Sequence, residues 1–462
     1  MDEAEMITLR PYQQDMIDKS RQALARCRAV LIVLQTGGGK TQIASFMAKS
    51  AALKGKRVMF ACHRDFLIEQ TSATFLDHGI SHTFIASGEK YYHQEPVCIA
   101  SIDTLKNRIG RYEAPDLFIC DEAIHAAAKG WSEVINNFRN AGSRIIGLGA
   151  CPHRGDGKGL GKWFDEMVIG PSMRELIDMG YLSDYKIYAP AGINRAALHV
   201  RAGEFINAEA EDVMNKPQIT GSAINEYKKY APGKQGIGFC VSIKHSQTVA
   251  EAFRAEGVNA AHIGSDTSKD DRKRMLSEFR QGKIKFLTSV DIFSEGFDLP
   301  VVEYAALLRP TKSLNIYRQQ IGRVLRKADG KDFARIADHA SNVTEHGMPD
   351  DHIEWTLKDR DRKESVDRAE QEVKARTCPQ CWYTSRPTQV CPNCGFVHPV
   401  ESREIEEVDG ELVELQRGIE RKAKRQEVGK AKTMAELERI AMERGYKRGW
   451  IYAQMKVKGI HG

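Results

Sequence analysis

Short apolar runs alternate with amphipathic helical patterns along most of this chain, and the alternation occurs twice. In the first half the runs are residues 30–34, 57–62, 97–101, 117–120 and 144–148. In the second half they are residues 236–241, 260–263, 285–290, 304–308 and 335–338. Such alternation is typical of parallel sheets that carry helices on both faces. The sequence therefore predicts an α/β fold with two parallel-sheet domains in tandem.

Changes of pattern give the expected domain limits. We expect the first α/β domain over residues 1–170 and the second over residues 235–340, joined by the irregular, polar stretch 171–234. The rest is expected to form a charged linker, a small cysteine-rich module and a basic tail, at residues 341–376, 377–398 and 399–462. A chain of 462 residues is long enough for two domain cores and such an appendage.

A glycine-rich segment follows the first apolar run and precedes a helical pattern. It reads Gln35-Thr36-Gly37-Gly38-Gly39-Lys40-Thr41. In a loop of this kind, backbone N–H groups surround the phosphates of a nucleotide and the next helix presents its positive end. Lys40 would reach the β- and γ-phosphate oxygens, and Thr41 would offer its hydroxyl to Mg²⁺. The segment predicts a binding site for ATP and Mg²⁺, with an ordinary glycine-rich turn as the alternative.

An acidic pair ends another apolar run. Asp121 and Glu122 follow residues 117–120, so they are expected at the carboxyl edge of the first sheet, where open α/β sheets bind their ligands. Asp121 would hold Mg²⁺ through water, and Glu122 would orient or deprotonate the attacking water. A solvated acidic turn is the alternative, which the upstream phosphate loop disfavours.

Two arginines on a predicted helix of the second domain complete the candidate catalytic set. Arg323 and Arg326 lie three residues apart in the segment 317–326, so they share a helix face. They could reach across a cleft and stabilise charge on the γ-phosphate, as arginine fingers do. A pair of exposed arginines on an ordinary helix is the alternative.

These segments resemble, in order, the motifs of superfamily 2 helicases over about the first 340 residues. The resemblance implies two tandem RecA-like domains that hydrolyse ATP, with Gln13 contacting the adenine and Asp298 the ribose. Segments 61–70 and 101–105, with Thr288, are similar to motifs that touch the nucleic-acid backbone. The nucleotide-binding residues that the resemblance implies are Arg10, Gln13, Thr36, Gly37, Gly38, Gly39, Lys40, Thr41, Gly296, Asp298 and Gln319.

The chain is especially similar to RadD-like and phage-encoded helicases, which share the opening of residues 9–13 and a cysteine-rich tail. This likeness implies action on single-stranded or forked DNA in replication, recombination or repair, in the cytoplasm of a bacterial or phage-infected cell. Single-strand-binding or recombination proteins are conceivable partners. An RNA helicase, or an ATP-gated DNA-binding module with little unwinding, is the alternative. The acidic start and the lack of long apolar runs predict neither a secretion signal nor a membrane span.

Leu34 stands where the phosphate loop usually begins with Gly or Ala, and three residues of motifs II and III also depart from the family pattern. Ile124 stands at the fourth position of motif II, which is usually polar, and the histidine comes one place later, at His125. Gly149 and Cys151 replace the hydroxyl residues of motif III. Because Ile124 cannot hydrogen-bond Gln319 across the domains, we expect fewer polar links between the nucleotide and the strand-gripping surface. The departures predict a motor that unwinds long duplexes poorly.

Four cysteines form a cluster of two CxxC pairs late in the chain. Cys378 and Cys381 precede Cys391 and Cys394 by a short spacing that suits a tetrahedral, structural Zn²⁺. A redox pair or two disulfides are the alternatives, which a chain without a secretion signal disfavours. The nearby side chains could stack bases and hold phosphates, or could form a solvated surface. They are Trp382, Tyr383, Arg386 and Phe396. Residues 417–432, in the tail, are strongly basic and are a further candidate for phosphate contacts.

Overall fold

The computed structural model describes residues 8–63, 65–89, 91, 94–152, 157–190, 193, 195, 198–201, 203–290, 299–359, 375–399, 433–444, 451 and 455. The chain divides into two compact units, Met1–His398 and Pro399–Gly462. The second unit contains α15 (Met434–Arg444), in which Leu437 and Ile440 pack with Ile451. The basic stretch 417–432 lies outside the described residues. Within the described parts of the chain, every helix is too short or too polar to span a bilayer.

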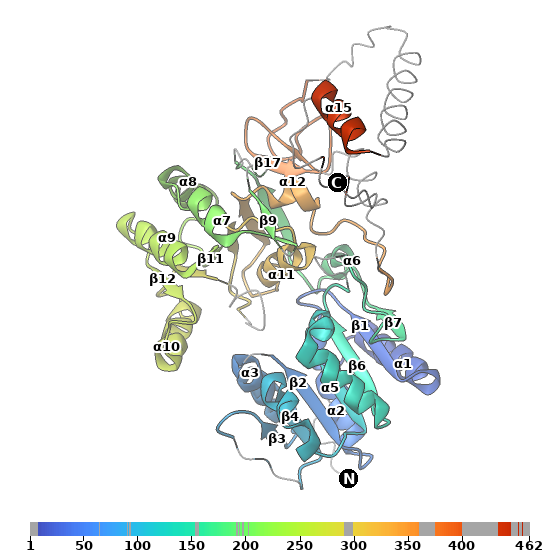
Figure 1. Ribbon diagram of the computed structural model, residues 1–462. Coiled ribbons are helices and arrows are strands. Elements are labelled where there is room, and N and C mark those ends of the chain that lie inside the picture. Colours follow the sequence, from blue (N-terminus) through green and yellow to red (C-terminus); the bar gives the residue numbers. More distant parts are fainter. Residues whose placement is uncertain are drawn as a thin grey trace. The chain divides into compact units, whose positions relative to one another are not determined.

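Seven parallel strands form the sheet of the first domain (Figure 1). Their order across the sheet is β3-β4-β2-β5-β6-β1-β7. The strands are β1 (Ala29–Val33), β2 (Val58–Cys62), β3 (Thr83–Ile85), β4 (Val97–Ser101), β5 (Leu117–Cys120), β6 (Arg144–Gly149) and β7 (Glu166–Ile169). All residues of β1, β2, β4 and β5 are buried, because helices cover both faces.

The helices of the first domain pack on the two faces that β1 presents. Val30 and Ile32 belong to a core that includes α1 (Pro11–Arg26), α2 (Lys40–Ala52) and α3 (Asp65–Asp77). Leu31 and Val33 point to the other face and belong to a second core. That second core includes α4 (Ile102–Lys106), the 3-10 segment Ala123–Ala127 and α5 (Lys129–Asn140). The alternation along one strand thus places helices on both faces of the sheet.

The sheet of the second domain has the order β12-β13-β11-β14-β15-β8-β17-β16. Strands β12 to β8 pair in parallel, whereas β17 and β16 are antiparallel additions at one edge. The strands are β8 (Asp184–Tyr188), β11 (Gly236–Phe239), β12 (Ala260–Ile263), β13 (Phe286–Ser289), β14 (Tyr304–Leu307), β15 (Phe333–Asp338), β16 (Arg376–Thr377) and β17 (Tyr383–Ser385). The helices are α7 (Asn207–Met214), α8 (Pro217–Tyr230), α9 (Ile243–Ala255), α10 (Lys269–Arg280), α11 (Leu314–Val324) and α12 (Asn342–His346). The two predicted α/β domains are therefore confirmed.

The stretch 171–234, expected to connect the two domains, contains regular structure of its own. It includes α6 (Met173–Asp178), and β8 within it is a strand of the second sheet, paired in parallel with β15. The first three residues of β8 are polar and are exposed or half-buried; they are Asp184, Tyr185 and Lys186. That polarity hides the strand from an analysis based on apolar runs.

Residues 355–359, expected within a charged linker, contact the first domain. Gly161 N donates to Leu357 O at 2.9 Å, and Gly159 N donates to Asp359 Oδ1 at 2.8 Å. A Cβ at Gly159 would collide with Leu357 O, so the backbones meet only because position 159 is glycine. Trp355 and Leu357 pack on the core of the first domain, so the chain returns to it after the second sheet.

Candidate functional site

The glycine-rich loop joins β1 to α2, as the sequence predicts. Gly37 and Gly39 have φ values of +87° and +88°, a region that favours glycine, and α2 begins directly afterwards at Lys40. At Gly38, an added Cβ would lie 2.7 Å from the Leu34 side chain. Each glycine is thus required by the backbone path, and the first turn of α2 offers its N–H groups to an anion.

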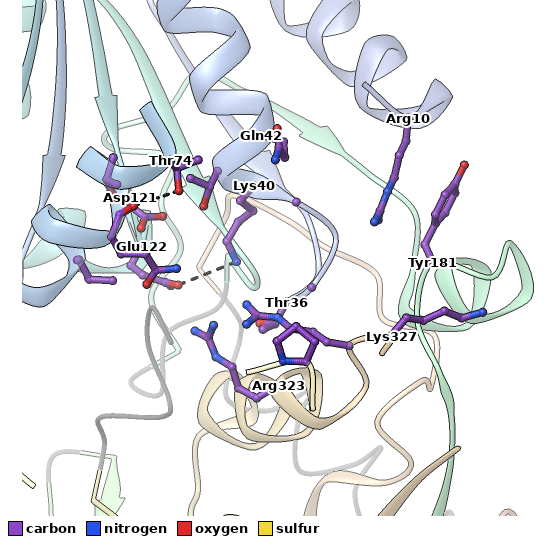
Figure 2. A pocket seen from close by; sticks show the side chains of 18 residues that line it. Arg10, Thr36, Lys40, Gln42, Thr74, Asp121, Glu122, Tyr181, Arg323 and Lys327 are labelled. Atoms are coloured by element: carbon purple, nitrogen blue, oxygen red, sulfur yellow. Dashed lines mark hydrogen bonds and ion pairs between the residues drawn. The ribbon is translucent and has the colours of Figure 1, made fainter. Parts of the chain in front are cut away.

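A cavity of about 340 Å³ lies over this loop and is lined by both domains (Figure 2). The first domain supplies the phosphate loop, the acidic pair and Arg10, and the second supplies arginines from α11 and the residues after it. Figure 2 shows Arg323 on the opposite side of the cavity from Lys40 and Glu122. The predicted site residues that line it are Arg10, Thr36, Gly37, Gly39, Lys40, Thr41, Asp121, Glu122, Arg323 and Arg326.

The two carboxylates stand at the end of β5, beside the lysine of the loop. Lys40 Nζ lies 4.0 Å from Glu122 Oε1, and the side chains are 13% and 8% exposed. Burial and the adjacent charge of Glu122 raise the pKa of Asp121 to about 6, while Lys40 lowers it. A half-buried and a buried carboxylate beside one lysine fit a divalent cation, and carboxylate and hydroxyl oxygens are the ligands that Mg²⁺ prefers. Asp121 and Thr41 are the residues that would hold it.

Glu122 also forms the polar link between the domains. Gln319 Nε2 donates to Glu122 Oε2 at 3.0 Å, and both side chains are buried. Glu122 adopts φ 46° and ψ 58°, a strained conformation for a residue with a Cβ. The apolar Ile124 predicts that Gln319 lacks a hydrogen-bond partner in the first domain. Glu122 provides that partner instead. The ring of His125 packs against that of His63, with 4.6 Å between the ring centroids.

The helix α11 packs directly on the phosphate loop. A Cβ added to Gly322 would lie 2.6 Å from Thr36 Cβ, and one added to Gly37 would lie 3.6 Å from Arg326 Cγ. Arg323 is 8% exposed. These close approaches place the two predicted arginines beside the residues expected to bind phosphate.

Gln13, close in sequence to the cavity-lining Arg10, is not among the residues that line the cavity; it is 2% exposed and holds the loop. Its Nε2 donates to Gly38 O at 3.0 Å, and its Oε1 accepts from Arg10 N at 2.9 Å. The guanidinium of Arg10 stacks over the ring of Tyr181 at 4.4 Å (Figure 2). Tyr181 and Lys327 also line the cavity, and sequence reasoning missed both because neither belongs to a motif. The predicted sugar-site residues Gly296 and Asp298 lie outside the described residues.

Thr288 is placed differently from the expectation. Its side chain is fully buried, and its hydroxyl donates to Ser246 O at 2.8 Å. It stabilises the second domain from inside, so its side chain does not offer the strand contact that the resemblance implies.

The four cysteines converge as their spacing predicts. Their sulfur atoms all lie within 4.8 Å of one another, with 3.6 Å between Cys378 and Cys394 and 3.8 Å between Cys381 and Cys391. A tetrahedral Zn²⁺ with Zn–S bonds of about 2.3 Å places its sulfurs about 3.8 Å apart, whereas a disulfide needs about 2.05 Å. Asn393 Nδ2 also donates to Cys381 Sγ at 3.5 Å. The donor set fits zinc.

The cysteine module is joined to the second domain by its backbone and side chains. Tyr383 of β17 pairs with Tyr188 of β8, and Tyr230 OH donates to Cys381 O at 3.1 Å. Arg386 donates to the carboxylates of Asp350 and Asp351. Tyr383 and Arg386, two of the four candidate nucleic-acid contacts, therefore help to hold the module on the sheet, Tyr383 through its backbone and Arg386 through its side chain.

Both domains match family models. Residues 6–154 match the res subunit of type III restriction enzymes, and residues 216–328 match the helicase conserved C-terminal domain. A 51.5 kDa protein of a Lactococcus phage is 31% identical over 396 residues, covering 82% of each chain. The chain belongs to the superfamily 2 helicases. A Saccharomyces cerevisiae relative, described as the ATP-dependent helicase IRC3, is 29% identical over 381 residues, covering 75% of the chain and 55% of that protein.

Solved structures support the helicase fold. An HsdR-subunit fragment of a type I restriction enzyme from Vibrio vulnificus superposes with a TM-score of 0.57 at 21% identity, covering 73% of the chain and 65% of the fragment. The S. cerevisiae protein Dbp5, bound to RNA and ADP BeF3, superposes with a TM-score of 0.51 at 15% identity, covering 78% of the chain and 97% of Dbp5. At these identities the likeness concerns the fold alone.

Proposed function

We propose that the chain is an ATP-driven DNA helicase or translocase, in which hydrolysis is coupled to closure of the two domains on a strand. The observation that carries the proposal is the shared cavity. It brings Lys40, Glu122 and Arg323 together from segments that are far apart in sequence.

The chemistry of hydrolysis follows from these positions. Lys40 and the N–H groups of the loop bind the phosphates, while Asp121 and Thr41 would hold Mg²⁺, which would supply positive charge to offset that of the phosphates. Glu122 orients the attacking water and accepts its proton. Arg323 and Arg326 stabilise the charge that develops on the γ-phosphate, and a buried site strengthens these interactions.

Coupling of ATP hydrolysis to domain movement follows from which domain supplies each catalytic group. The phosphate loop and the carboxylates belong to the first domain, whereas the arginines belong to the second. Hydrolysis is fast only when the domains are closed, and loss of the γ-phosphate removes a contact that favours closure. Gln319, bonded to Glu122, connects the water-activating residue to the same helix as the arginines.

DNA is the proposed polymer, in replication, recombination or repair. The match of residues 6–154 to a restriction-enzyme subunit supports DNA, because restriction enzymes act on DNA. The resemblance to RadD-like and phage-encoded helicases points the same way. RNA is the competing polymer.

A motor with weak unwinding is the second candidate function. Gly149 and Cys151 offer no hydroxyl, and Cys151 is buried. The Gln319–Glu122 bond supplies one link between the domains, so coupling is retained in part. We expect translocation or remodelling of DNA to be more efficient than separation of long duplexes.

Parallel assays with several nucleic acids test the proposal. ATP turnover is measured with single-stranded DNA, duplex DNA, forked DNA and RNA, and strand separation is measured on forks with short and long duplexes. We expect single-stranded or forked DNA to stimulate turnover most, with opening of the short duplex only. Stimulation by RNA alone would reassign the polymer, and efficient opening of long duplexes would contradict the weak-unwinding candidate.

A further inference from the structure

The C-terminal end of α11 is held by a lysine that belongs to none of the helicase motifs. Lys331 Nζ donates to the carbonyl oxygens of Val324, Arg326 and Val302, at 2.7 Å for Arg326 and 2.6 Å for Val302. The last carbonyls of a helix have no partner within the helix, and a cation there also opposes the negative end of its dipole. Lys331 therefore holds the end of α11 and the backbone of Arg326, a residue that lines the cavity.

The same short segment is held from its other side by the chain between the domains. Ser183 N donates to Leu325 O at 2.7 Å, and Leu182 forms a β-bridge with Arg326. The carbonyl groups of residues 324, 325 and 326 are thus each bonded outside the helix, two of them by Lys331. These bonds define the position of the Arg326 backbone, and its side chain lies beside Gly37, where an added Cβ would be 3.6 Å from Arg326 Cγ.

We propose that Lys331 is a positioning residue for ATP hydrolysis, whose ammonium group holds the backbone of Arg326 so that the guanidinium reaches the phosphates. The inference rests on the proposed function, because it assigns Arg326 to the transition state. Lys331 does not line the nucleotide cavity, so its effect passes through Arg326 and not through a contact with ATP.

The number of acceptors explains why this position favours a charged side chain with several donors. Three carbonyl oxygens accept from Nζ, and only the ammonium form carries three N–H groups. Burial lowers the pKa of Lys331 to about 7; the charge of Glu303 raises it, and that of Arg326 lowers it. Loss of one proton leaves two donors for three acceptors.

The test compares Lys331→Met, which removes all donors, with Lys331→Arg, which keeps several. At about pH 6.5, where the ammonium form predominates, we expect Lys331→Met to lower kcat for ATP about 10-fold. Because Lys331 does not contact the nucleotide, KM should change less than about twofold. Lys331→Arg should recover most of the loss. Lys49→Met is the matched control, because Lys49 also caps a carbonyl, that of His78, within the first domain; its turnover should equal that of wild type.

A double-mutant cycle separates positioning from general destabilisation. If Lys331 acts through Arg326, adding Lys331→Met to Arg326→Ala should cause no further loss of kcat. Multiplicative losses, or a KM change as large as the kcat change, would overturn the inference. If Lys331→Met fails to fold, Lys331→Gln takes its place in the same cycle. Wild-type protein without ATP turnover on any nucleic acid contradicts the proposed function, whereas active wild type with unchanged Lys331→Met contradicts this inference alone.

Discussion

The nucleotide cavity and the cysteine cluster are assembled in opposite ways. The cavity gathers residues from Arg10 to Lys327, on two domains, whereas the cluster uses one short segment from Cys378 to Cys394. The geometry of the cluster is local, so its spacing alone predicts it. The geometry of the cavity depends on how two sheets meet, so domain movement would switch the chemistry that we propose there.

The largest expected effect is at the phosphate loop. Lys40→Ala removes the positive charge beside the transferring phosphate, and Glu122→Gln removes the group that accepts the proton of water. We expect each to reduce ATP turnover on the order of 10²-fold or more, with ATP still bound by Glu122→Gln. Turnover is measured by phosphate release and binding by a fluorescent ATP analogue. Activity within a fewfold of wild type in either variant would remove the assignment.

The next effect concerns the contribution of the second domain. Arg326→Ala should lower kcat about 10²-fold while nucleotide affinity stays nearly unchanged, because the contact with the γ-phosphate strengthens in the transition state. Arg318→Ala would not serve as a control, because Arg318 is buried. Arg274→Ala, on exposed α10, is a suitable control and should behave as wild type. Equal losses of binding and turnover in Arg326→Ala would indicate a folding defect instead.

Substitutions in the cysteine cluster, unlike those in the nucleotide cavity, should affect mainly the small module that contains them. Freshly purified protein should contain one zinc per chain, and Cys378→Ser or Cys391→Ser should release it, because the metal stabilises the fold of such a module. ATP turnover should remain at about half or more, since β17 only adds to the edge of the second sheet. Metal analysis checks the first claim and phosphate release the second. Protein that carries no zinc would refute the site, and complete loss of turnover would refute the independence of the two regions.

The link between the domains should have a smaller effect. Gln319→Ala removes one buried hydrogen bond to Glu122, worth about 0.5–1.5 kcal/mol, so stimulation of turnover by DNA should fall about two- to tenfold. Basal turnover should change less. The measurement is the ratio of turnover with and without single-stranded DNA, and an unchanged ratio would show that coupling runs through other residues.

The smallest effect is a pH dependence at Lys331. Its ammonium form predominates below pH 7 and is lost as the pH rises through about 7, so positioning of Arg326 should weaken on the alkaline side. Lys331→Arg keeps its charge throughout, so its turnover relative to wild type should rise about two- to fivefold between about pH 6 and pH 9. Parallel profiles for the two proteins would contradict this assignment of the titrating group.

The two sheets and most of the predicted cavity residues could be identified from sequence, because strands and motifs carry local signals. Each motif combines an apolar strand with a turn, and the carboxyl ends of parallel strands meet at one edge. Three features had no such signal. β8 is polar, Tyr181 stands outside every motif, and Lys331 acts through backbone carbonyls that no side-chain pattern marks.

The hydrogen bond between Gln319 and Glu122 shows a different limit of prediction from sequence. The apolar Ile124 suggested a missing link, since only the usual motif position was considered. The left-handed conformation of Glu122 turns its carboxylate toward both Lys40 and Gln319. The backbone conformation of Glu122, which no motif position indicates, thus accompanies the link between the domains.

We propose that hydrolysis depends on closure of both domains on a strand. This proposal is tested most directly by the kcat of ATP turnover in the wild-type protein with and without single-stranded DNA, with Arg326→Ala measured alongside. We expect DNA to raise the wild-type value at least about tenfold and to leave Arg326→Ala nearly unstimulated. A wild-type value that is the same with and without DNA or RNA would contradict the account.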